Sequence, residues 1–139
     1  NYMEFITNIQ IGSNGRLGNQ IFQYVILLVL NKLYKISIRI PVVKTCNAYK
    51  NFRLNEIFHK LNYQILDKIP NNIPSYYEKN EFYDNNIYKL GNVNVRCLNI
   101  KGYFQSYKYL MGYEEYINDL YKLQIEGYYK NIKNLFSNW

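Results

Sequence analysis

Three glycines, Gly12, Gly15 and Gly18, stand at regular intervals near the start of the chain. They follow a short apolar segment and precede a long one, so we expect a loop that joins a strand to a helix. Backbone N–H groups and the helix dipole at the start of a helix favour a bound anion, and glycine lets the backbone approach a ligand closely. Arg16, inside this loop, can donate a bidentate contact to phosphate oxygens.

The Gly-x-x-Gly-x-x-Gly spacing differs from the two best-known phosphate motifs. It is not the dinucleotide-binding fingerprint, and it lacks the Lys-Ser/Thr pair of a P-loop. Two interpretations of the loop therefore stay open. It is either a phosphate site or a tight turn between strand and helix in which Arg16 is solvated.

Acidic and histidine side chains are weaker candidates for chemistry. Glu114, Glu115 and Asp119 fall on the polar face of an expected amphipathic helix, where solvated carboxylates are a simpler interpretation than a general-base pair. His59 is the single histidine, and we expect it at the surface or partly buried. None of these residues is therefore assigned a role in a site.

The pattern of apolar residues around the glycine loop predicts a βαβ unit. Alternating residues predict strands over 5–11 and 36–40. The segment 20–33 is apolar on nearly every face, which is typical of a buried helix, and Asn19 is its expected N-cap. A strand, a helix and a second strand in this order favour parallel strands joined by a right-handed crossover.

The rest of the chain is less regular. The further expected elements are a short helix over 54–61, mostly loop with short strands over 67–94, a strand over 95–100, an amphipathic helix over 106–123 and another over 128–136. We expect a break near Gly112 in the helix over 106–123, because glycine weakens a helix interior.

The chain has 139 residues, enough for one domain of ordinary size. Its 17 basic and 10 acidic side chains give a net charge of +7, which suits a nucleotide diphosphate or peripheral contact with an anionic membrane surface. The basic residues form no block and no nucleic-acid motif accompanies them, so no nucleic-acid partner is expected. The alternative is a lysine-rich surface without a dedicated partner.

Two cysteines, Cys46 and Cys97, are too few for a disulfide scaffold and fit no metal motif. We expect reduced thiols in a reducing compartment, with a single disulfide bridge between them as the alternative. The longest strictly apolar run, Val25 to Leu30, is far shorter than the ~20 residues that cross a bilayer, and no secretory signal is visible. The sequence therefore predicts a cytoplasmic location.

Three segments, in order along the chain, resemble the α-1,2-fucosyltransferase family. The first, similar to the family's Gly-Gly-Leu-Gly-Asn-Gln-Met-Phe-Gln-Tyr, is Gly15-Arg16-Leu17-Gly18-Asn19-Gln20-Ile21-Phe22-Gln23-Tyr24. The second, similar to Phe-x-Leu-x-x-Phe-Phe, comprises Phe52-Arg53-Leu54 and Ile57-Phe58. The third, similar to Gly-Tyr-Phe/Trp-Gln-Ser-Glu-Lys-Tyr, is Gly102-Tyr103-Phe104-Gln105-Ser106-Tyr107-Lys108-Tyr109.

Two departures from the family pattern bear on the site. Arg16 stands where the family has its second glycine, and Tyr107 stands where it has glutamate. The related protein O-fucosyltransferases carry Gly-Arg-Phe-Gly-Asn-Gln, whose arginine and asparagine lie beside the donor's diphosphate and the reacting centre. This resemblance implies that Arg16 and Asn19 are catalytic. The residues for which it implies substrate binding are Gly15, Leu17, Gly18, Gln20, Tyr103, Gln105 and Ser106.

The resemblance also implies an architecture and a reaction. Residues 1–139 would form the Rossmann-like, acceptor-side N-terminal half of a GT-B glycosyltransferase, and the donor-binding half with its His-x-Arg-Arg-Gly-Asp motif would lie outside this chain. The implied reaction is the inverting transfer of L-fucose from GDP-fucose to a galactoside hydroxyl on a glycan acceptor, without metal or other cofactor. The rival hypothesis is a non-catalytic remnant, or a carbohydrate-binding α/β domain, of the same ancestry.

Overall fold

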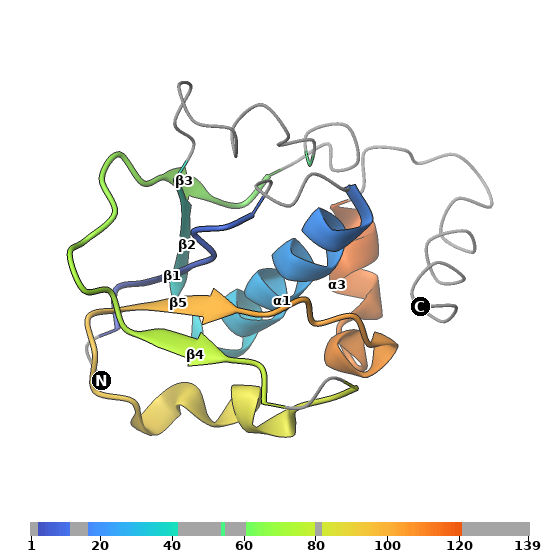
Figure 1. Cartoon of the computed structure of the whole chain (residues 1–139). Coiled ribbons are helices and arrows are strands. Elements are labelled where there is room, and N and C mark those ends of the chain that lie inside the picture. The colour runs from blue at the N-terminus through green and yellow to red at the C-terminus, as the bar shows by residue number, and fades with distance from the viewer. Residues whose placement is uncertain (1–2, 12–16, 42–53, 55–60, 80–81, 121–139) are drawn as a thin grey trace.

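The computed structural model describes residues 3–11, 17–41, 54, 61–79 and 82–120 (Figure 1). The elements in chain order are β1 (Phe5–Thr7), α1 (Leu17–Tyr34), β2 (Ser37–Ile40), β3 (Gln64–Ile65), β4 (Ser75–Tyr77), the 3₁₀ helix η2 (Asn85–Asn92), β5 (Cys97–Lys101), the 3₁₀ helix η3 (Tyr107–Leu110) and α3 (Glu114–Asp119).

Five short strands form one parallel sheet in the order β3-β2-β1-β5-β4. Phe5 of β1 lies opposite Ser37 of β2 on one side and Cys97 of β5 on the other. The strand β5 comes last in the chain but pairs centrally, with Asn99 also opposite Ser75 of β4. The prediction of an α/β fold with a parallel sheet and flanking helices is confirmed.

The strand order turns back at β1. From β1 the chain passes through α1 to β2 on one side, whereas β5 returns much later to the other side. In open parallel sheets, ligands bind outside the carboxyl ends of the strands at such a switch point. The ends of β1 and β5 are therefore the place to look for a site.

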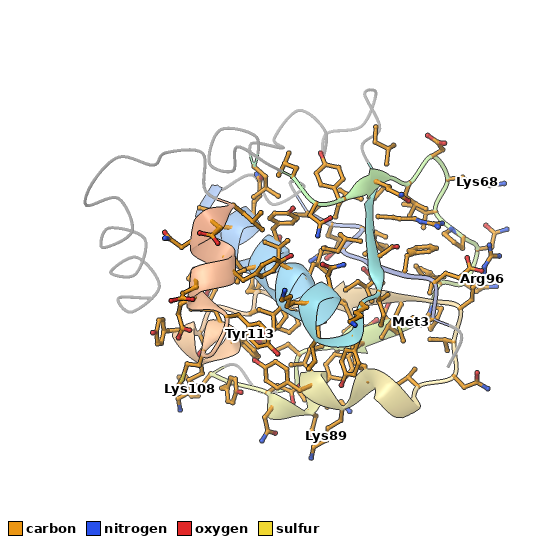
Figure 2. All side chains as sticks on the ribbon, turned by 180° about the vertical axis from the view of Figure 1, so that it is seen from behind. Met3, Lys68, Lys89, Arg96, Lys108 and Tyr113 are labelled. Atoms are coloured by element: carbon orange, nitrogen blue, oxygen red, sulfur yellow. The ribbon has the colours of Figure 1, made fainter. Side chains whose placement is uncertain are left out.

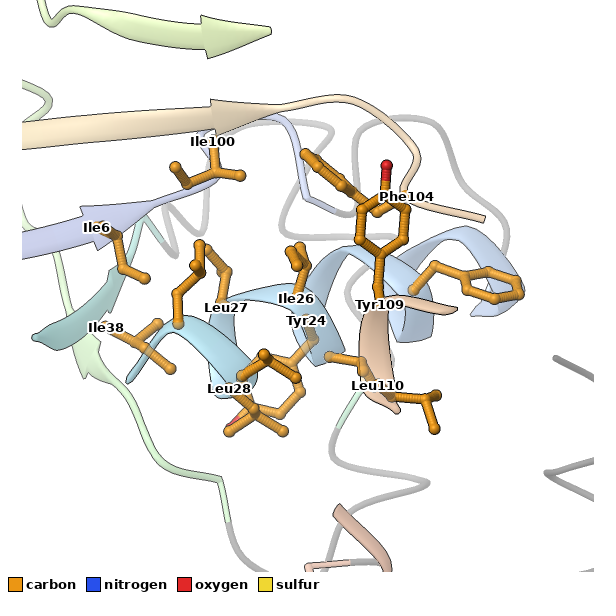
Figure 3. Packing of buried hydrophobic residues seen from close by; sticks show 14 of the residues in the cluster. Ile6, Tyr24, Ile26, Leu27, Leu28, Ile38, Ile100, Phe104, Tyr109 and Leu110 are labelled. Carbon is orange, nitrogen blue, oxygen red and sulfur yellow. The ribbon is translucent and has the colours of Figure 1, made fainter. Parts of the chain in front are cut away.

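The helix α1 packs on one face of the sheet (Figure 1). Every residue from Gln20 to Leu30 is buried, which confirms the prediction of a helix that is enclosed on all sides. Figure 3 shows Ile6, Ile38 and Ile100, one from each of three strands, directed toward this helix. The burial of each such side chain contributes about 1.5–3 kcal/mol to folding.

The start of α1 differs from the prediction. The helix begins at Leu17, two residues before the expected N-cap, Asn19. Asn19 therefore lies within the first turn, and its Oδ1 accepts a hydrogen bond from the side chain of Gln105 at 2.7 Å. The expected N-cap is wrong because Asn19 is a helical residue whose side chain bonds across the fold.

The first strand is also shorter than predicted, since it ends at Thr7 instead of residue 11. Asn8 closes a turn there: its Oδ1 accepts from the N–H of Gln10 at 3.0 Å and its carbonyl oxygen from the N–H of Ile11 at 3.3 Å. An asparagine that accepts hydrogen bonds from the backbone that follows it competes with the hydrogen bonds between strands. The apolar alternation therefore continues to residue 11, although the strand ends at Thr7.

Two further differences concern helical segments. Within 67–94, predicted as mostly loop, residues 85–92 form η2, which Asp84 caps through a hydrogen bond from the N–H of Asn86 at 3.0 Å. The predicted helix over 106–123 is divided into η3 and α3, with the expected break at Gly112, whose φ is 89°. The predicted helix over 128–136 and most of that over 54–61 lie outside the described residues.

The helix α3 lies beside α1 (Figure 1), where the Tyr116 hydroxyl donates to Asn31 at 3.4 Å. On the opposite face of the sheet, a second, smaller apolar cluster joins Phe5, Leu66 and Cys97.

None of the helices in the described ranges has both the length and the apolar character needed to cross a membrane.

Candidate functional site

The first turns of α1 meet the connection between β5 and η3 at the carboxyl end of the sheet. Gln105 Nε2 donates to Asn19 Oδ1 at 2.7 Å, across 86 positions of sequence. One turn further along α1, Gln23 Nε2 donates to the carbonyl oxygen of Gly102 at 3.2 Å. We call Asn19 and Gln105 the amide pair. It joins the first and third of the segments that carry the family resemblance.

The connection that presents Gln105 has an uncommon backbone. Gly102 has φ 147° and Phe104 has φ 51°, so two residues out of three lie in the left-handed region. A Cβ on Gly102 would lie 2.6 Å from the Cβ of Glu78, which excludes any larger residue without a shift of the backbone. Phe104 is 1% exposed, and its burial fixes the middle of the connection.

The end of β1 is held to β5 and β4 by Asn99. Its Oδ1 accepts from the N–H of Ile9 at 3.1 Å, and its Nδ2 donates to Ser75 Oγ at 3.1 Å. Asn99 is 2% exposed, and a buried amide that is bonded on both sides fixes the geometry around it. The segment that follows β1 is therefore held firmly against the sheet.

Below the connection, two carboxylates and two tyrosine hydroxyls form a hydrogen-bonded network. The Tyr109 hydroxyl donates to Glu78 Oε2 at 2.5 Å and accepts from the N–H of Asp84 at 2.7 Å. The Tyr76 hydroxyl donates to Asp84 Oδ2 at 2.5 Å. Burial is the largest cause that raises the pKa of Tyr76 and of Tyr109, and their hydrogen bonds to carboxylates raise it further.

Asp84 stays ionised inside this network. Burial alone would raise the pKa of its carboxyl group, but hydrogen bonds from the Tyr76 hydroxyl and from the N–H groups of Lys79 and Asn86 outweigh that effect. The net result is a pKa below the ordinary value. Because the Asp84 carboxylate accepts all these hydrogen bonds, it stabilises the fold rather than transferring protons.

The predicted site residues fall into four groups. Asn19 and Gln105 are brought together, whereas Gly15 and Arg16 lie outside the described residues. Leu17 and Gly18 form the start of α1. The other predicted binding residues have different surroundings: Gln20 is 1% exposed, Tyr103 is 49% exposed, and Ser106 Oγ caps η3 by accepting from the N–H of Lys108 at 3.2 Å.

The acidic candidates on α3 lie where the sequence predicted them. Glu115 and Asp119 are exposed. Glu114 braces the start of the helix, since its carboxylate accepts from the N–H of Gly112 at 2.9 Å and from the Tyr107 hydroxyl at 3.4 Å. The structure thus supports solvated or structural carboxylates rather than a general-base pair.

Metal-ligating and thiol side chains give no second site in the described part of the chain. No cluster of three or more histidine, cysteine, aspartate or glutamate residues is found there. Cys97 is buried, and burial raises the pKa of its thiol, which stays protonated at neutral pH. Cys46 and His59 lie outside the described residues.

The charge of the described surface is distributed, not gathered at one face. Figure 2 shows Lys68, Lys89, Arg96 and Lys108 at separate places on the outline of the molecule. Arg96 Nε donates to Glu4 at 3.1 Å, and both side chains are largely exposed. Surface pairs of this kind contribute little, and this distribution does not form a basic groove.

Four amide side chains lie instead near the carboxyl ends of β1 and β5: Asn19, Gln23, Asn99 and Gln105. Gln23 and Asn99 are buried, whereas Asn19 and Gln105 are partly exposed. An amide both donates and accepts hydrogen bonds, so the partly exposed pair matches the hydroxyls of a sugar. The sequence missed Gln23, Glu78 and Asp84 as parts of this region. Asp84 had a local signal, because Asp before Asn-Asn is typical of a helix N-cap, whereas Glu78 had none.

The fold and the site define the chain as an α/β protein with a parallel sheet and a hydrogen-bonded amide pair at its switch point. The chain matches no protein-family model, no curated protein and no solved structure. Any more particular assignment therefore depends on the residues themselves.

Proposed function

We propose that the chain is the N-terminal, acceptor-side portion of an α-1,2-fucosyltransferase with GT-B architecture. The observation that supports this most is the amide pair. Two short segments that resemble the same family, and that are 86 residues apart at Asn19 and Gln105, make a direct hydrogen bond at 2.7 Å. Unrelated chance matches would have no reason to meet at the switch point of a parallel sheet.

The proposed reaction is the inverting transfer of L-fucose from GDP-fucose to a galactoside hydroxyl. Arg16 and the N–H groups at the start of α1 would neutralise charge that develops on the leaving diphosphate, a role often filled by a metal ion. The amide pair and Tyr103 would bind sugar hydroxyls and a sugar face. The proposal retains a cytoplasmic location and a reaction without metal.

The places assigned to acceptor and donor follow from the chemistry of the side chains. An amide cluster suits a neutral glycan, whereas a guanidinium at a helix start suits a diphosphate. The proposal therefore assigns the acceptor to the end of β5 and the diphosphate to the loop before α1. The donor's nucleotide would bind mainly to the second half of a GT-B enzyme, outside residues 1–139.

The test is a transfer assay with GDP-fucose and a galactose-terminated acceptor, on the product of the complete reading frame. We expect Arg16→Ala to lower turnover about a hundredfold, since losing one preorganised charge contact in a transition state has about this effect. The matched control is Arg96→Ala, which removes an exposed arginine that pairs only with exposed Glu4. It should leave turnover unchanged.

Residues 1–139 alone are the second arm of this experiment. A few exposed charge-assisted hydrogen bonds support at most about millimolar binding once ordering is included, so calorimetry with GDP-fucose should detect weak binding or none. Equal turnover for wild type and Arg16→Ala at saturating donor would refute the role of Arg16. Micromolar binding by the chain alone would place the donor site within it and refute the division into halves.

A further inference from the structure

We propose that Glu78, which belongs to none of the segments that resemble the fucosyltransferases, is the positioning residue of the amide pair. It acts by holding the connection between β5 and η3 in the conformation that directs Gln105 toward Asn19. Its importance for catalysis rests on the function proposed above, whereas its effect on the amide pair does not.

The connection needs an external support because its backbone is strained. Phe104 has φ 51°, and a non-glycine residue in the left-handed region is less stable than in its ordinary conformation by about 1–2 kcal/mol. Such a residue persists only where its surroundings hold it. Three contacts hold it here: its buried ring, which is 1% exposed, its N–H, which donates to Glu78 Oε1 at 3.1 Å, and its carbonyl oxygen, which accepts from the N–H of Ser106 at 2.9 Å. Of the two hydrogen bonds, the one to Glu78 comes from outside the connection.

Glu78 is itself fixed from three directions. Its N–H donates to the carbonyl oxygen of Lys101 at 2.9 Å, directly after the pairing of β4 with β5. Its Oε2 accepts from the Tyr109 hydroxyl at 2.5 Å. Its Cβ occupies the space that a side chain at position 102 would need. These contacts fix the position from which the Glu78 carboxylate accepts the hydrogen bond of Phe104.

The same contacts argue against a catalytic role for this carboxylate. Each of its two oxygens already accepts from a protein donor, the N–H of Phe104 and the hydroxyl of Tyr109. A general base must be free to take a proton from a substrate. Glu78 therefore acts through the backbone, one residue away from Gln105.

The experiment measures the hydrogen bond of the amide pair directly, by nuclear magnetic resonance of the Gln105 side-chain NH₂ group. In Glu78→Ala, residue 104 can relax to negative φ, so Gln105 should leave Asn19. Hydrogen exchange of this NH₂ group should then rise about tenfold, as expected when a hydrogen bond of ordinary net strength is lost. Glu78→Gln keeps one acceptor oxygen for the N–H of Phe104 and should restore slow exchange.

The matched control is Tyr76→Phe. It removes a 2.5 Å hydrogen bond to Asp84 from the same network but keeps the hydrogen bonds that Glu78 accepts from Phe104 and Tyr109. Exchange at Gln105 should therefore stay as in wild type. If Glu78→Ala does not fold, Glu78→Asp carries the test. It keeps the charge but is one methylene shorter, so it cannot span from Tyr109 to Phe104 and should also speed exchange. Unchanged exchange in the folded Ala or Asp variant would overturn the proposal.

A transfer assay on the complete reading frame separates this inference from the proposed function. If the amide pair acts on the reacting groups, Glu78→Ala should lower kcat about tenfold with the KM for GDP-fucose little changed, because it alters orientation rather than donor binding. If kcat fell only because the protein is less stable, Tyr76→Phe would lower kcat as well. That result would overturn the positioning role of Glu78. A wild-type protein without transfer activity would refute the proposed function, while the exchange measurement would still decide the role of Glu78.

Discussion

At the scale of single residues, the hydroxyls of buried and partly buried tyrosines connect distant parts of the chain. The Tyr24 hydroxyl accepts from the N–H of Asn62 at 2.7 Å, the Tyr34 hydroxyl accepts from the N–H of Leu90 at 3.1 Å, and the Tyr88 hydroxyl donates to the carbonyl oxygen of Tyr109 at 2.9 Å. Burial raises the pKa of Tyr24 and Tyr88, which therefore remain neutral donors and acceptors at physiological pH. In the described part of the chain, these tyrosines therefore serve the structure rather than a sugar-binding surface.

Asp84 gives a prediction at this scale. Asp84→Asn removes the charge that accepts hydrogen bonds from the Tyr76 hydroxyl and from the N–H groups of Lys79 and Asn86. Because hydrogen bonds to a charged acceptor are the stronger ones, we expect a loss of about 1–3 kcal/mol in unfolding free energy at pH 7. Urea denaturation followed by circular dichroism measures it.

The pH dependence of this variant provides its control. The pKa of Asp84 in the folded state lies below its ordinary value of 3.8. The stabilisation is therefore fully present above pH 3.8 and is lost as the pH falls through the folded pKa. The difference between wild type and Asp84→Asn should shrink below about pH 4. A difference that stays constant down to pH 2 would contradict the assignment.

At the scale of elements, the sequence predicted the βαβ unit correctly and its boundaries less well. Continuous apolar composition identified α1, because a helix that is buried on every side leaves few polar positions. The observed boundaries differ from the predicted ones where a side chain bonds away from the regular pattern. The turn at Asn8 follows the end of β1, and Asn19 lies inside α1 instead of capping it. The sequence missed η2, whose short, asparagine-rich segment 85–92 has no clear period.

Two glycines in turns allow a matched comparison of the connections. Gly102→Ala places a Cβ 2.6 Å from the Cβ of Glu78 at φ 147°, whereas Gly112→Ala at φ 89° meets nothing within 4 Å. We expect about 1 kcal/mol of destabilisation at Gly112, from backbone strain alone. Gly102→Ala should cost about 3 kcal/mol or more, since the connection must also move.

Thermal unfolding of the two variants measures this difference. For a domain of this size we expect the Tm of Gly112→Ala to fall by a few degrees, and that of Gly102→Ala by at least twice as much. Equal shifts in Tm would show that the close approach of Glu78 to Gly102 has no energetic effect. That result would also weaken the role proposed for Glu78.

At the scale of the whole molecule, the order of the strands in the sheet could not be predicted from the sequence. Local patterns identified the segments of β1, β2 and β5, but the pairing of parallel strands leaves no local signal, because their connections are long. The sequence therefore contained no sign that β5 lies between β1 and β4. The family resemblance named Asn19 and Gln105 as separate site residues but did not predict their hydrogen bond. The support by Glu78 depends on the pairing of β4 with β5, which the sequence did not predict.

The sheet order predicts which backbone amides are best protected. The strands β1 and β5 are paired on both sides, whereas β3 and β4 are at the edges, where Ile65 and Tyr77 are 59% and 57% exposed. Edge strands can open locally, but central strands open only with the core. The slowest amides of β1 and β5 should exchange at least about a hundredfold more slowly than those of β3 and β4 in native-state hydrogen exchange. Equal protection in β4 and β1 would contradict this order.

The central position of β5 also has a consequence for synthesis on the ribosome. The segments of β1, α1, β2 and β3 emerge first and can associate, because β1 pairs with β2 and β2 with β3. The strand β4 emerges next, but its partner in the sheet is β5, which leaves the ribosome about 20 residues later. Until residue 101 has been released, β1 has an open edge and β4 is unattached. A pause in translation within this interval would expose two unpaired strand edges of one nascent chain, and it is there that a chaperone would be needed.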